Sequence, residues 1–353
     1  MPVVETVDLA APCAGEVLIR IVASGICHTD LGVHAGRGPG TPLPAVLGHE
    51  GAGVVLETGP GVTQLAVGDH VVLSGSSCGV CPSCRRNFPS YCQEAMPRNF
   101  GGQRMDGSSA LSQNGTRLGG HFFGQSSFAR HCIASERTAV KVSRELPLEL
   151  LGPLGCGVIT GAGAVLYSLG VEPGQSVAIF GTGGVGLSAV MAARLVGARQ
   201  IIAVDRIAAR LRLARELGAT HALDAAAPDV AQQIIEITRG GADRTLNTTR
   251  APEVFTVAMQ CLAMQGVAGF VAAPATAWQP ALFPMLAGGR RLQGILGGDA
   301  APQVVIPVLL DYYSQGRLPF DRLLQFYSFA DIGAAFNDME HGEVIKPVLR
   351  MAA

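Results

Sequence analysis

Four cysteines lie close together in the chain, at a spacing that suits a closed metal site. Cys78, Cys81, Cys84 and Cys92 form a C-x2-C-x2-C-x7-C cluster. Four thiolates from one loop can complete a tetrahedron around Zn²⁺ and leave no coordination position open. Ferredoxin-type iron–sulfur sites begin similarly but normally end in C-x3-C-P, whereas the last gap here is seven residues. We therefore expect a structural zinc, with an iron–sulfur cluster or unmetallated thiols as the alternatives.

Two further cysteines and one histidine have the residue types of a second, open site. Cys27, His49 and Cys156 are far apart in the chain, within the short motifs GICHTD, LGHEG and LGCGVITG. A single histidine is more often a packed core residue than a ligand, but these motifs together favour a ligand. Two thiolates and one imidazole leave the fourth position of a zinc free for water or substrate. The sequence therefore predicts a catalytic zinc.

A glycine-rich turn has the features of a dinucleotide-binding site. GTGGVG at residues 181–186 follows the apolar run VAIF, opens a predicted helix, and precedes Asp205 at the end of the next predicted strand. The helix N-terminus can bind a pyrophosphate, and Asp205 can bind the ribose hydroxyls and repel a 2′-phosphate. NAD is thus favoured over NADP, although Arg206 could partly accommodate that phosphate. A turn that binds nothing is the alternative. The predicted cofactor residues are Gly181, Thr182, Gly183, Gly184, Val185, Gly186, Asp205 and Arg206.

Composition limits the other classes of partner. The chain has 353 residues, 48% of them apolar and 15% charged, and its formal net charge is −1. We therefore expect no nucleic acid and no membrane partner. The uncharged stretches 150–171 and 254–289 are interrupted by glycine and proline, so they fit buried core better than membrane spans. Metal-type cysteine spacing, without a secretion signal, predicts a cytoplasmic protein.

Two kinds of predicted element must position these residues. The first 150 residues are rich in glycine and proline, with short strands at 16–23, 53–58 and 70–74 and a long surface loop at 93–120. From residue 158 the chain alternates, with strands at 176–180 and 201–205 and helices at 184–196, 208–217 and 231–238. Such alternation predicts an α/β fold with a doubly wound parallel sheet. We expect residues 1–157 and 297–353 to form one domain and residues 158–296 the other.

Taken together, these motifs resemble the zinc-dependent medium-chain alcohol dehydrogenase family over essentially the whole chain. The motifs are CHTD, GHEG, the four-cysteine loop, GPLGCGVITGAG, GTGGVG with Asp205, and the terminal IKPVL. HFFGQSSFA at 121–129 and LPLELLGPLGCG at 146–157 are most similar to the bacterial aryl-alcohol and geraniol dehydrogenases. The resemblance implies a Rossmann NAD-binding domain, a β-rich GroES-like catalytic domain, two Zn²⁺ per chain and NAD.

The resemblance also implies roles for individual residues. Cys27, His49 and Cys156 would be the catalytic zinc ligands, with Asp30 orienting the His49 ring and Glu50 just behind the metal. Thr29 would receive the alcohol proton, His28 and Lys346 would face the cofactor pyrophosphate, and Thr160 would pack near the nicotinamide. An apolar substrate pocket would be lined by Phe122, Phe123, Ile295 and Leu296. For the four pocket residues, simple core packing is an equal alternative. Many relatives have a relay histidine where this chain has Gly32.

The resulting hypothesis is a reversible, zinc-dependent oxidation of a primary aromatic or allylic alcohol to the aldehyde, with hydride transfer to NAD. We expect a small-molecule alcohol or aldehyde as substrate, and a homodimer or homotetramer. A polyol or a glutathione-adduct (formaldehyde) dehydrogenase is the alternative within the family. A non-catalytic nucleotide-binding protein and an iron–sulfur electron carrier are the alternatives outside it.

Overall fold

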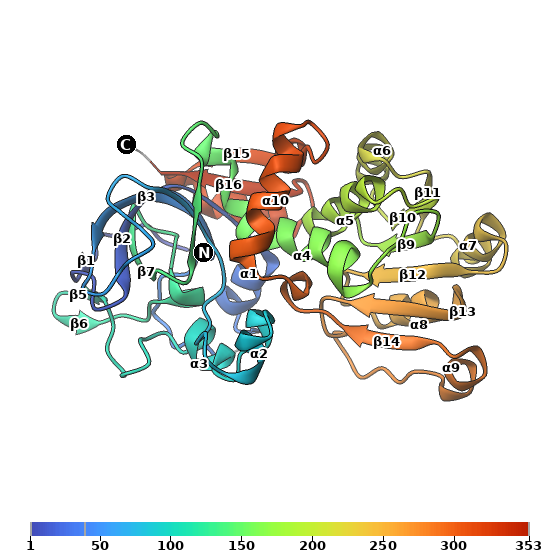
Figure 1. The fold of residues 1–353 in the computed structure, drawn as a ribbon, viewed down its shortest axis with the longest axis horizontal. Coiled ribbons are helices and arrows are strands. Elements are labelled where there is room, and N and C mark those ends of the chain that lie inside the picture. Colours follow the sequence, from blue (N-terminus) through green and yellow to red (C-terminus); the bar gives the residue numbers. More distant parts are fainter. Residues whose placement is uncertain (1, 39, 352–353) are drawn as a thin grey trace. The chain divides into compact units, whose positions relative to one another are not determined.

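The computed structural model describes residues 2–38 and 40–351. The chain forms two compact units, each described here by itself (Figure 1). Unit 1 comprises Met1–Cys156, Ala301–Pro307 and Asp321–Ala353, and unit 2 comprises Gly157–Ala300 and Val308–Phe320. The border between them runs through helix α10 (Pro302–Ser314).

Unit 2 contains the predicted doubly wound parallel sheet. Its strand order is β11-β10-β9-β12-β13-β14, and every neighbouring pair is parallel. The order reverses between β9 and β12, which is the switch point where such sheets bind ligands. All five residues of β9 are buried, as a strand covered on both faces requires. The strands are β9 (Ser176–Phe180), β10 (Gln200–Asp205), β11 (His221–Asp224), β12 (Ala242–Asn247), β13 (Leu262–Phe270) and β14 (Arg291–Gly294).

The helices of unit 2 follow the predicted alternation. The helices are α4 (Gly157–Gly163), which continues into the π-helix η5 (Ala164–Ser168), α5 (Gly184–Leu195), α6 (Ala208–Leu217), α7 (Val230–Thr238), α8 (Pro252–Gln260), α9 (Leu282–Gly288) and the short 3-10 helix η6 (Gly297–Asp299). Helix α6 ends at Gly218, whose φ of 127° is open to glycine but strained for other residues. The predicted α/β fold class is therefore confirmed.

Unit 1 is built on a seven-stranded sheet with the order β15-β16-β2-β3-β4-β8, in which β7 also pairs with β2. The strands are β2 (Glu16–Gly25), β3 (Glu50–Thr58), β4 (His70–Leu73), β7 (His131–Ser135), β8 (Ala139–Val142), β15 (Leu324–Ser328) and β16 (Lys346–Arg350). Alternate residues of β2, among them Val17, Ile19 and Ile21, point into the core. Strand β16 pairs antiparallel with β2, so the end of the chain completes a sheet that its beginning starts.

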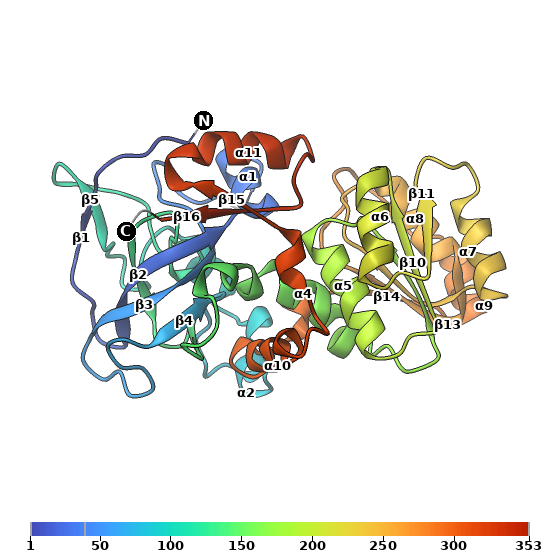
Figure 2. The same ribbon diagram turned by 90° about the horizontal axis from the view of Figure 1, so that it is seen from above.

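Short helices cover this sheet. Helices α1 (His28–His34) and α11 (Ile332–Glu340) lie side by side near β16 (Figure 2), where the rings of His34 and Phe336 meet edge to face at 5.7 Å. The other helical segments are α2 (Pro82–Arg85), η1 (Pro89–Tyr91), η2 (Phe122–Gly124), η3 (Leu148–Leu150), η4 (Gly152–Gly155), η7 (Phe320–Leu323) and η8 (Phe329–Asp331).

One predicted loop has more structure than expected. Residues 93–120 contain helix α3 (Ala95–Phe100) and strands β5 (Leu111–Gln113) and β6 (Thr116–Arg117). Strand β5 also pairs with β1 (Asp8–Leu9), which makes a separate three-stranded sheet. Arg104 anchors this region through two hydrogen bonds to Glu16 of β2. Strands of two or three residues leave no visible alternation in a sequence, so the prediction of a loop was wrong here.

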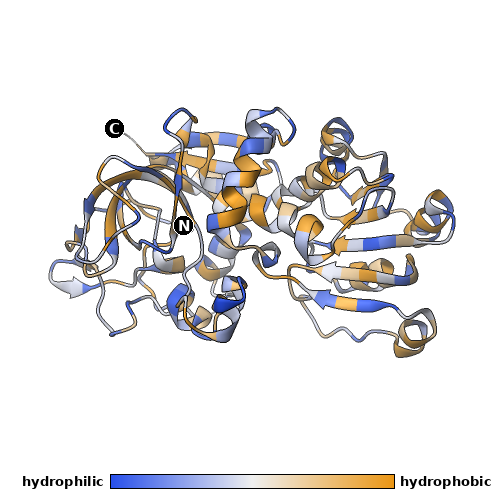
Figure 3. Ribbon diagram, in the orientation of Figure 1, coloured by the Kyte–Doolittle hydropathy of each residue, from blue (hydrophilic) through white to orange (hydrophobic). Residues whose placement is uncertain are grey.

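Apolar residues are spread over both units (Figure 3). Within the described part of the chain, no helix combines the length and the apolarity needed to span a bilayer.

Candidate active site

Three side chains from distant motifs converge in unit 1. The ligand atoms of Cys27, His49, Glu50 and Cys156 all lie within 4.8 Å of one another. Antiparallel pairing of β2 with β3 sets Gly25 opposite Glu50, so Cys27 and His49 meet at one end of the two strands. Cys156 follows η4, and its Sγ lies 4.0 Å from the Sγ of Cys27. Two sulfurs and an imidazole are therefore brought together as a metal site needs.

Asp30 fixes the orientation of the histidine. Its Oδ1 lies 3.1 Å from the His49 Nδ1, and both side chains are fully buried. The same carboxylate accepts hydrogen bonds from the backbone N–H groups of Cys27 and Gly48, and it forms the capping box of α1. When Nδ1 keeps its proton and donates a hydrogen bond to Asp30, Nε2 carries no proton and presents a lone pair. That Nε2 is buried and has no hydrogen-bond partner among the described residues, so the site fits a metal ion.

The thiol of Cys27 is prepared for ionisation. The hydrogen bond that it shares with Cys156 holds the pKa of Cys27 well below its ordinary value, although burial opposes the shift. The ammonium group of Lys346 adds positive charge nearby, which favours the thiolate further. A thiolate is the form of cysteine that binds a metal.

A buried ion pair lies directly behind these ligands. Lys346 Nζ donates to Glu50 Oε1 at 2.8 Å, to Oε2 at 2.9 Å and to the Ile26 carbonyl at 2.9 Å. Burial raises the pKa of Glu50 to about 7, and the ammonium group of Lys346 opposes that rise. The sequence predicted that Lys346 faces a pyrophosphate. In the structure its ammonium group contacts Glu50 and Ile26 inside unit 1, and only 4% of the residue is exposed.

The residues beside Cys27 form the start of helix α1. His28, the first residue of the helix, is exposed, and Thr29 is half-buried with its Oγ1 3.7 Å from the Cys27 Sγ. Gly32 lies in the same helix, and a Cβ built on it would meet no atom within 4 Å. Thr29 is thus the hydroxyl of this motif that lies beside a predicted ligand.

An aromatic cluster lines one side of His49. The Phe123 ring stacks on the imidazole with centroids 4.3 Å apart, and Phe100 meets Phe123 edge to face at 5.0 Å. Phe122 is fully buried in the core and presents its edge to His49. Phe123 keeps partial exposure, so of the two predicted pocket phenylalanines it is the one that a ligand can reach. Sequence reasoning missed Phe100, because nothing local links it to the HFFG motif.

Three other predicted residues belong to unit 2. Thr160 lies in α4 and is half-buried. Ile295 is buried and Leu296 is 53% exposed, both directly after β14. Their predicted roles at the nicotinamide and in the substrate pocket stay predictions.

The four-cysteine cluster is a separate site in unit 1. The sulfurs of Cys78, Cys81, Cys84 and Cys92 lie within 4.8 Å of one another. Backbone N–H groups of Cys78 and Glu94 donate to the Cys92 sulfur, and that of Cys81 donates to Cys78. Backbone hydrogen bonds from Cys84 and Gln93 lower the pKa of Cys81 to about 6. Four convergent sulfurs with N–H donors fit a closed zinc site.

The glycine-rich turn lies at the switch point of the sheet in unit 2. Gly181, with a φ of 86°, directly follows β9, and α5 begins at Gly184. A Cβ on Gly186 would lie 1.8 Å from the Gly181 carbonyl oxygen, so only glycine permits this approach of helix to strand. Asp205 ends β10 and lies against the turn, where its Oδ2 accepts hydrogen bonds from the Thr182 N–H at 2.6 Å and the Thr182 hydroxyl at 2.8 Å. The glycine-rich motif alone did not reveal the hydrogen bonds between Thr182 and Asp205.

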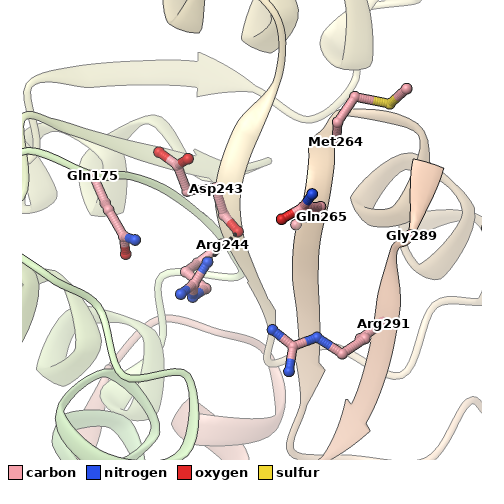
Figure 4. Close-up of a pocket in the computed structure, with 8 residues that line it drawn as sticks. Gln175, Asp243, Arg244, Met264, Gln265, Gly289 and Arg291 are labelled. Carbon is pink, nitrogen blue, oxygen red and sulfur yellow. Dashed lines mark hydrogen bonds between the residues drawn. The ribbon is translucent and has the colours of Figure 1, made fainter.

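A polar cavity of about 530 Å³ lies at the other end of the same sheet (Figure 4). It is lined by Gln175, Asp243, Arg244, Met264, Gln265, Gly266, Gly289 and Arg291, which lie at the amino ends of their strands. Ligands of open α/β sheets bind at the carboxyl ends. The cavity is therefore distinct from the predicted dinucleotide site.

Comparison with known proteins places these features in a wider context. The family model "Alcohol dehydrogenase GroES-like domain" matches residues 13–144, and "Zinc-binding dehydrogenase" matches residues 184–312. Geraniol dehydrogenase from Castellaniella defragrans is 50% identical over 350 residues, which cover 98% of this chain and 93% of that protein. S-(hydroxymethyl)glutathione dehydrogenase from Synechocystis is 36% identical, over 97% of this chain and 94% of that protein. The crystal structure of benzyl alcohol dehydrogenase from Acinetobacter calcoaceticus matches with a TM-score of 0.95 at 44% identity, over 99% of this chain and 95% of the other.

Proposed function

The chain belongs to the zinc-dependent medium-chain alcohol dehydrogenases, which transfer hydride from an alcohol to NAD, and from this membership we propose that it oxidises primary aromatic and allylic alcohols reversibly to aldehydes. The observation that carries the proposal is the convergence of Cys27, His49 and Cys156, in which the buried Nε2 of His49 has no hydrogen-bond partner among the described residues and the partly exposed ring of Phe123 stacks on the imidazole. The ligand set supports the chemistry, and the aromatic ring supports the class of substrate.

Cys27, His49 and Cys156 would hold the catalytic zinc, which when bound supplies a Lewis acid that polarises the oxygen of the alcohol or aldehyde. Asp30 keeps the proton on Nδ1 of His49 and so fixes the lone pair of Nε2. The Thr29 hydroxyl can donate and accept at once, so it can receive the alcohol proton and release another. Gly32 carries no side chain for a relay, so the proton would leave Thr29 by way of the cofactor ribose and water, or through another residue.

The apolar, aromatic surroundings of His49 favour an unsaturated substrate. Phe123 and Phe100 offer ring faces and edges to a benzyl or allylic group. A polyol needs several hydroxyl partners, and a glutathione adduct needs cationic anchors. The sequence identities of the relatives support the same preference, because the geraniol dehydrogenase is 50% identical to this chain and the glutathione-adduct dehydrogenase is 36% identical.

An alcohol panel tests this proposal. With NAD, we expect benzyl alcohol and geraniol to give kcat/KM values at least roughly 100-fold above ethanol, because an apolar pocket gains most from burying the larger group. Sorbitol and S-(hydroxymethyl)glutathione serve as the competing substrate classes. A higher kcat/KM for either of these would contradict the proposed specificity while leaving the family membership intact.

Coenzyme choice gives a second test. Replacing Asp205 by glycine should lower the preference for NAD over NADP by roughly 10- to 100-fold, because hydrogen bonds that the ribose hydroxyls donate to a charged carboxylate contribute about 1.5–3 kcal/mol. Arg206 then remains to face the 2′-phosphate. Initial-rate kinetics with both coenzymes measure the ratio, and Arg206→Ala in the Asp205→Gly background tests the arginine. Unchanged discrimination in Asp205→Gly would exclude Asp205 as the selecting residue.

We further propose that residues 1–157 and 297–353 act as the catalytic domain and residues 158–296 as the NAD domain, in a cytoplasmic enzyme. The strand order of unit 2 and the metal ligands in unit 1 support this division. The use of six of the nine cysteines in two predicted metal sites supports a reducing compartment.

The enzyme is proposed to be a homodimer or homotetramer that forms through the β14 edge of the sheet. Strand β14 pairs only with β13 among the described residues, and the neighbouring α9 exposes 73% of Leu282, 76% of Phe283 and 81% of Leu286. A second copy would cover both the open edge and this apolar helix.

Light scattering tests the assembly. Leu286→Asp should shift the protein toward monomers, because an aspartate would be buried without a partner at the interface. Val67→Asp, at a site in unit 1 that is 64% exposed, should leave the mass unchanged. A wild-type monomer, or a Leu286→Asp variant with the wild-type mass, would exclude this interface.

A further inference from the structure

We propose that Gln125 is a positioning residue of the open metal site, because its amide, together with Ser74, links the backbone segments that carry His49 and Cys156. The inference rests on the proposed function in one respect: it takes Cys27, His49 and Cys156 as the ligands of the catalytic zinc.

The Gln125 side chain is 1% exposed, and all its polar atoms are engaged around His49. Its Oε1 accepts a hydrogen bond from the Gly51 N–H at 3.1 Å. Its Nε2 donates to the His49 carbonyl at 3.0 Å and to the Ser74 carbonyl at 3.2 Å. One amide thus holds the backbone on both sides of Glu50 and ties it to the end of β4. Asp30 fixes the ring of His49, whereas Gln125 fixes its backbone.

A second hydrogen bond extends this link to Cys156. The Ser74 hydroxyl donates to the Gly155 carbonyl at 2.7 Å, and Gly155 directly precedes Cys156. Gln125 and Ser74 therefore form a continuous connection from the backbone of His49 to the residue before the last ligand. The ligand atoms must keep their mutual distances for a tetrahedral metal ion, and this connection spans two of the three segments that set those distances.

The loop that carries Gln125 is built to point it inward. Phe123 and Ser126 on either side have φ values of 53°, a left-handed conformation that costs free energy for a non-glycine residue. The N–H groups of Ser127 and Phe128 donate to the carbonyls of Gly48 and Leu47, so the loop is fastened to the His49 segment. The same loop thus delivers the Phe123 ring to the face of His49 and the Gln125 amide to its backbone. This arrangement links the metal site to the aromatic wall.

Gln125→Glu is the sharpest test, because it keeps the shape and the acceptor for Gly51 but replaces the donor that faces two carbonyls. We expect the open site to bind zinc about 10- to 100-fold more weakly, as is typical when a residue supporting a metal ligand is lost. The four-cysteine site should keep its zinc. Chelator competition with metal analysis counts the two sites, and the visible spectrum of the Co²⁺-substituted open site reports its geometry.

Matched variants separate positioning from simple folding. Ser127→Ala removes one hydrogen bond, to the Ser24 hydroxyl, from an equally buried side chain of the same loop, so its zinc affinity should stay within about twofold of wild type. Ser74→Ala removes only the hydrogen bond to Gly155, and it should weaken zinc binding at the open site as Gln125→Glu does. The inference therefore stays testable if Gln125→Glu fails to fold.

Three results would overturn the inference. The first is wild-type zinc affinity and an unchanged cobalt spectrum in folded Gln125→Glu, or in Ser74→Ala where Gln125→Glu does not fold. The second is equal weakening of both zinc sites, which would indicate a general loss of stability. The third is a wild-type protein that binds zinc only at the four-cysteine site. The third result would contradict the proposed ligand set and with it the proposed function, whereas the first two would contradict only the role of Gln125. Failure of the inference and failure of the proposed function are therefore distinguishable.

Discussion

The Cys156→Ala variant is expected to lose turnover by at least roughly 10³-fold while it keeps the zinc of the four-cysteine site and the ability to bind NADH. Cys156 supplies one of the three proposed ligands, and its Sγ lies 4.0 Å from that of Cys27. Removing a ligand from a site with three protein donors leaves two, which is too few to hold a catalytic zinc. A loss of Lewis-acid activation by several kcal/mol lowers the rate by about tenfold for each 1.36 kcal/mol.

The measurement is a steady-state assay combined with metal analysis, which should fall from two zinc ions per chain to one. Cys132→Ala is the matched control, because Cys132 lies buried in the same unit, and burial raises the pKa of its thiol to about 12. Cys132 is not among the side chains whose ligand atoms converge in either cluster, so its loss should leave both zinc ions in place. Normal activity in Cys156→Ala protein that contains a single zinc would refute the ligand assignment, whereas loss of both zinc ions would point to a general disruption.

Motifs whose chemistry is local could be read from the sequence. The turn at residues 181–186 can be recognised locally, because a strand, four glycines and a helix follow one another within a short stretch. The doubly wound parallel sheet of unit 2 then follows from the alternation of strands and helices. The four cysteines are equally local. For Cys27, His49 and Cys156, each short motif is weak alone, and only the resemblance to a family joined them.

The partners of buried polar groups could not be predicted in the same way. Lys346 meets Glu50 across 296 residues of sequence, and Gln125 reaches Ser74 across 51. These contacts depend on the pairing of β16 with β2 and on the path of the loop after η2. No local pattern records which of several distant carboxylates or carbonyls a buried donor will find. Before the structure is known, one can expect only that a buried ammonium group has such a partner, without knowing which residue provides it.

The Lys346→Met variant is expected to lose about 3–5 kcal/mol of unfolding free energy, the largest stability change among the variants considered. Glu50 is 0% exposed, and Lys346 Nζ contacts both of its carboxylate oxygens. Removing Lys346 leaves the buried Glu50 carboxylate without its partner, so it must take up a proton or stay charged in an apolar site, and either outcome costs free energy. Replacing both partners by uncharged residues of similar volume should cost far less. The double variant Glu50→Gln/Lys346→Met should therefore be more stable than Lys346→Met alone.

Urea unfolding of the zinc-loaded wild type, of the two single variants Glu50→Gln and Lys346→Met, and of the double variant completes a double-mutant cycle. Arg37→Met is the control, because the Arg37–Glu340 pair is 62% and 60% exposed and should contribute less than about 1 kcal/mol. If Lys346→Met were no less stable than Arg37→Met, Glu50 would not depend on Lys346 for its charge. The ammonium group would then be available to the pyrophosphate, as the sequence predicted. A large loss that the double variant recovers would instead make the pair a fixed support directly behind the metal ligands.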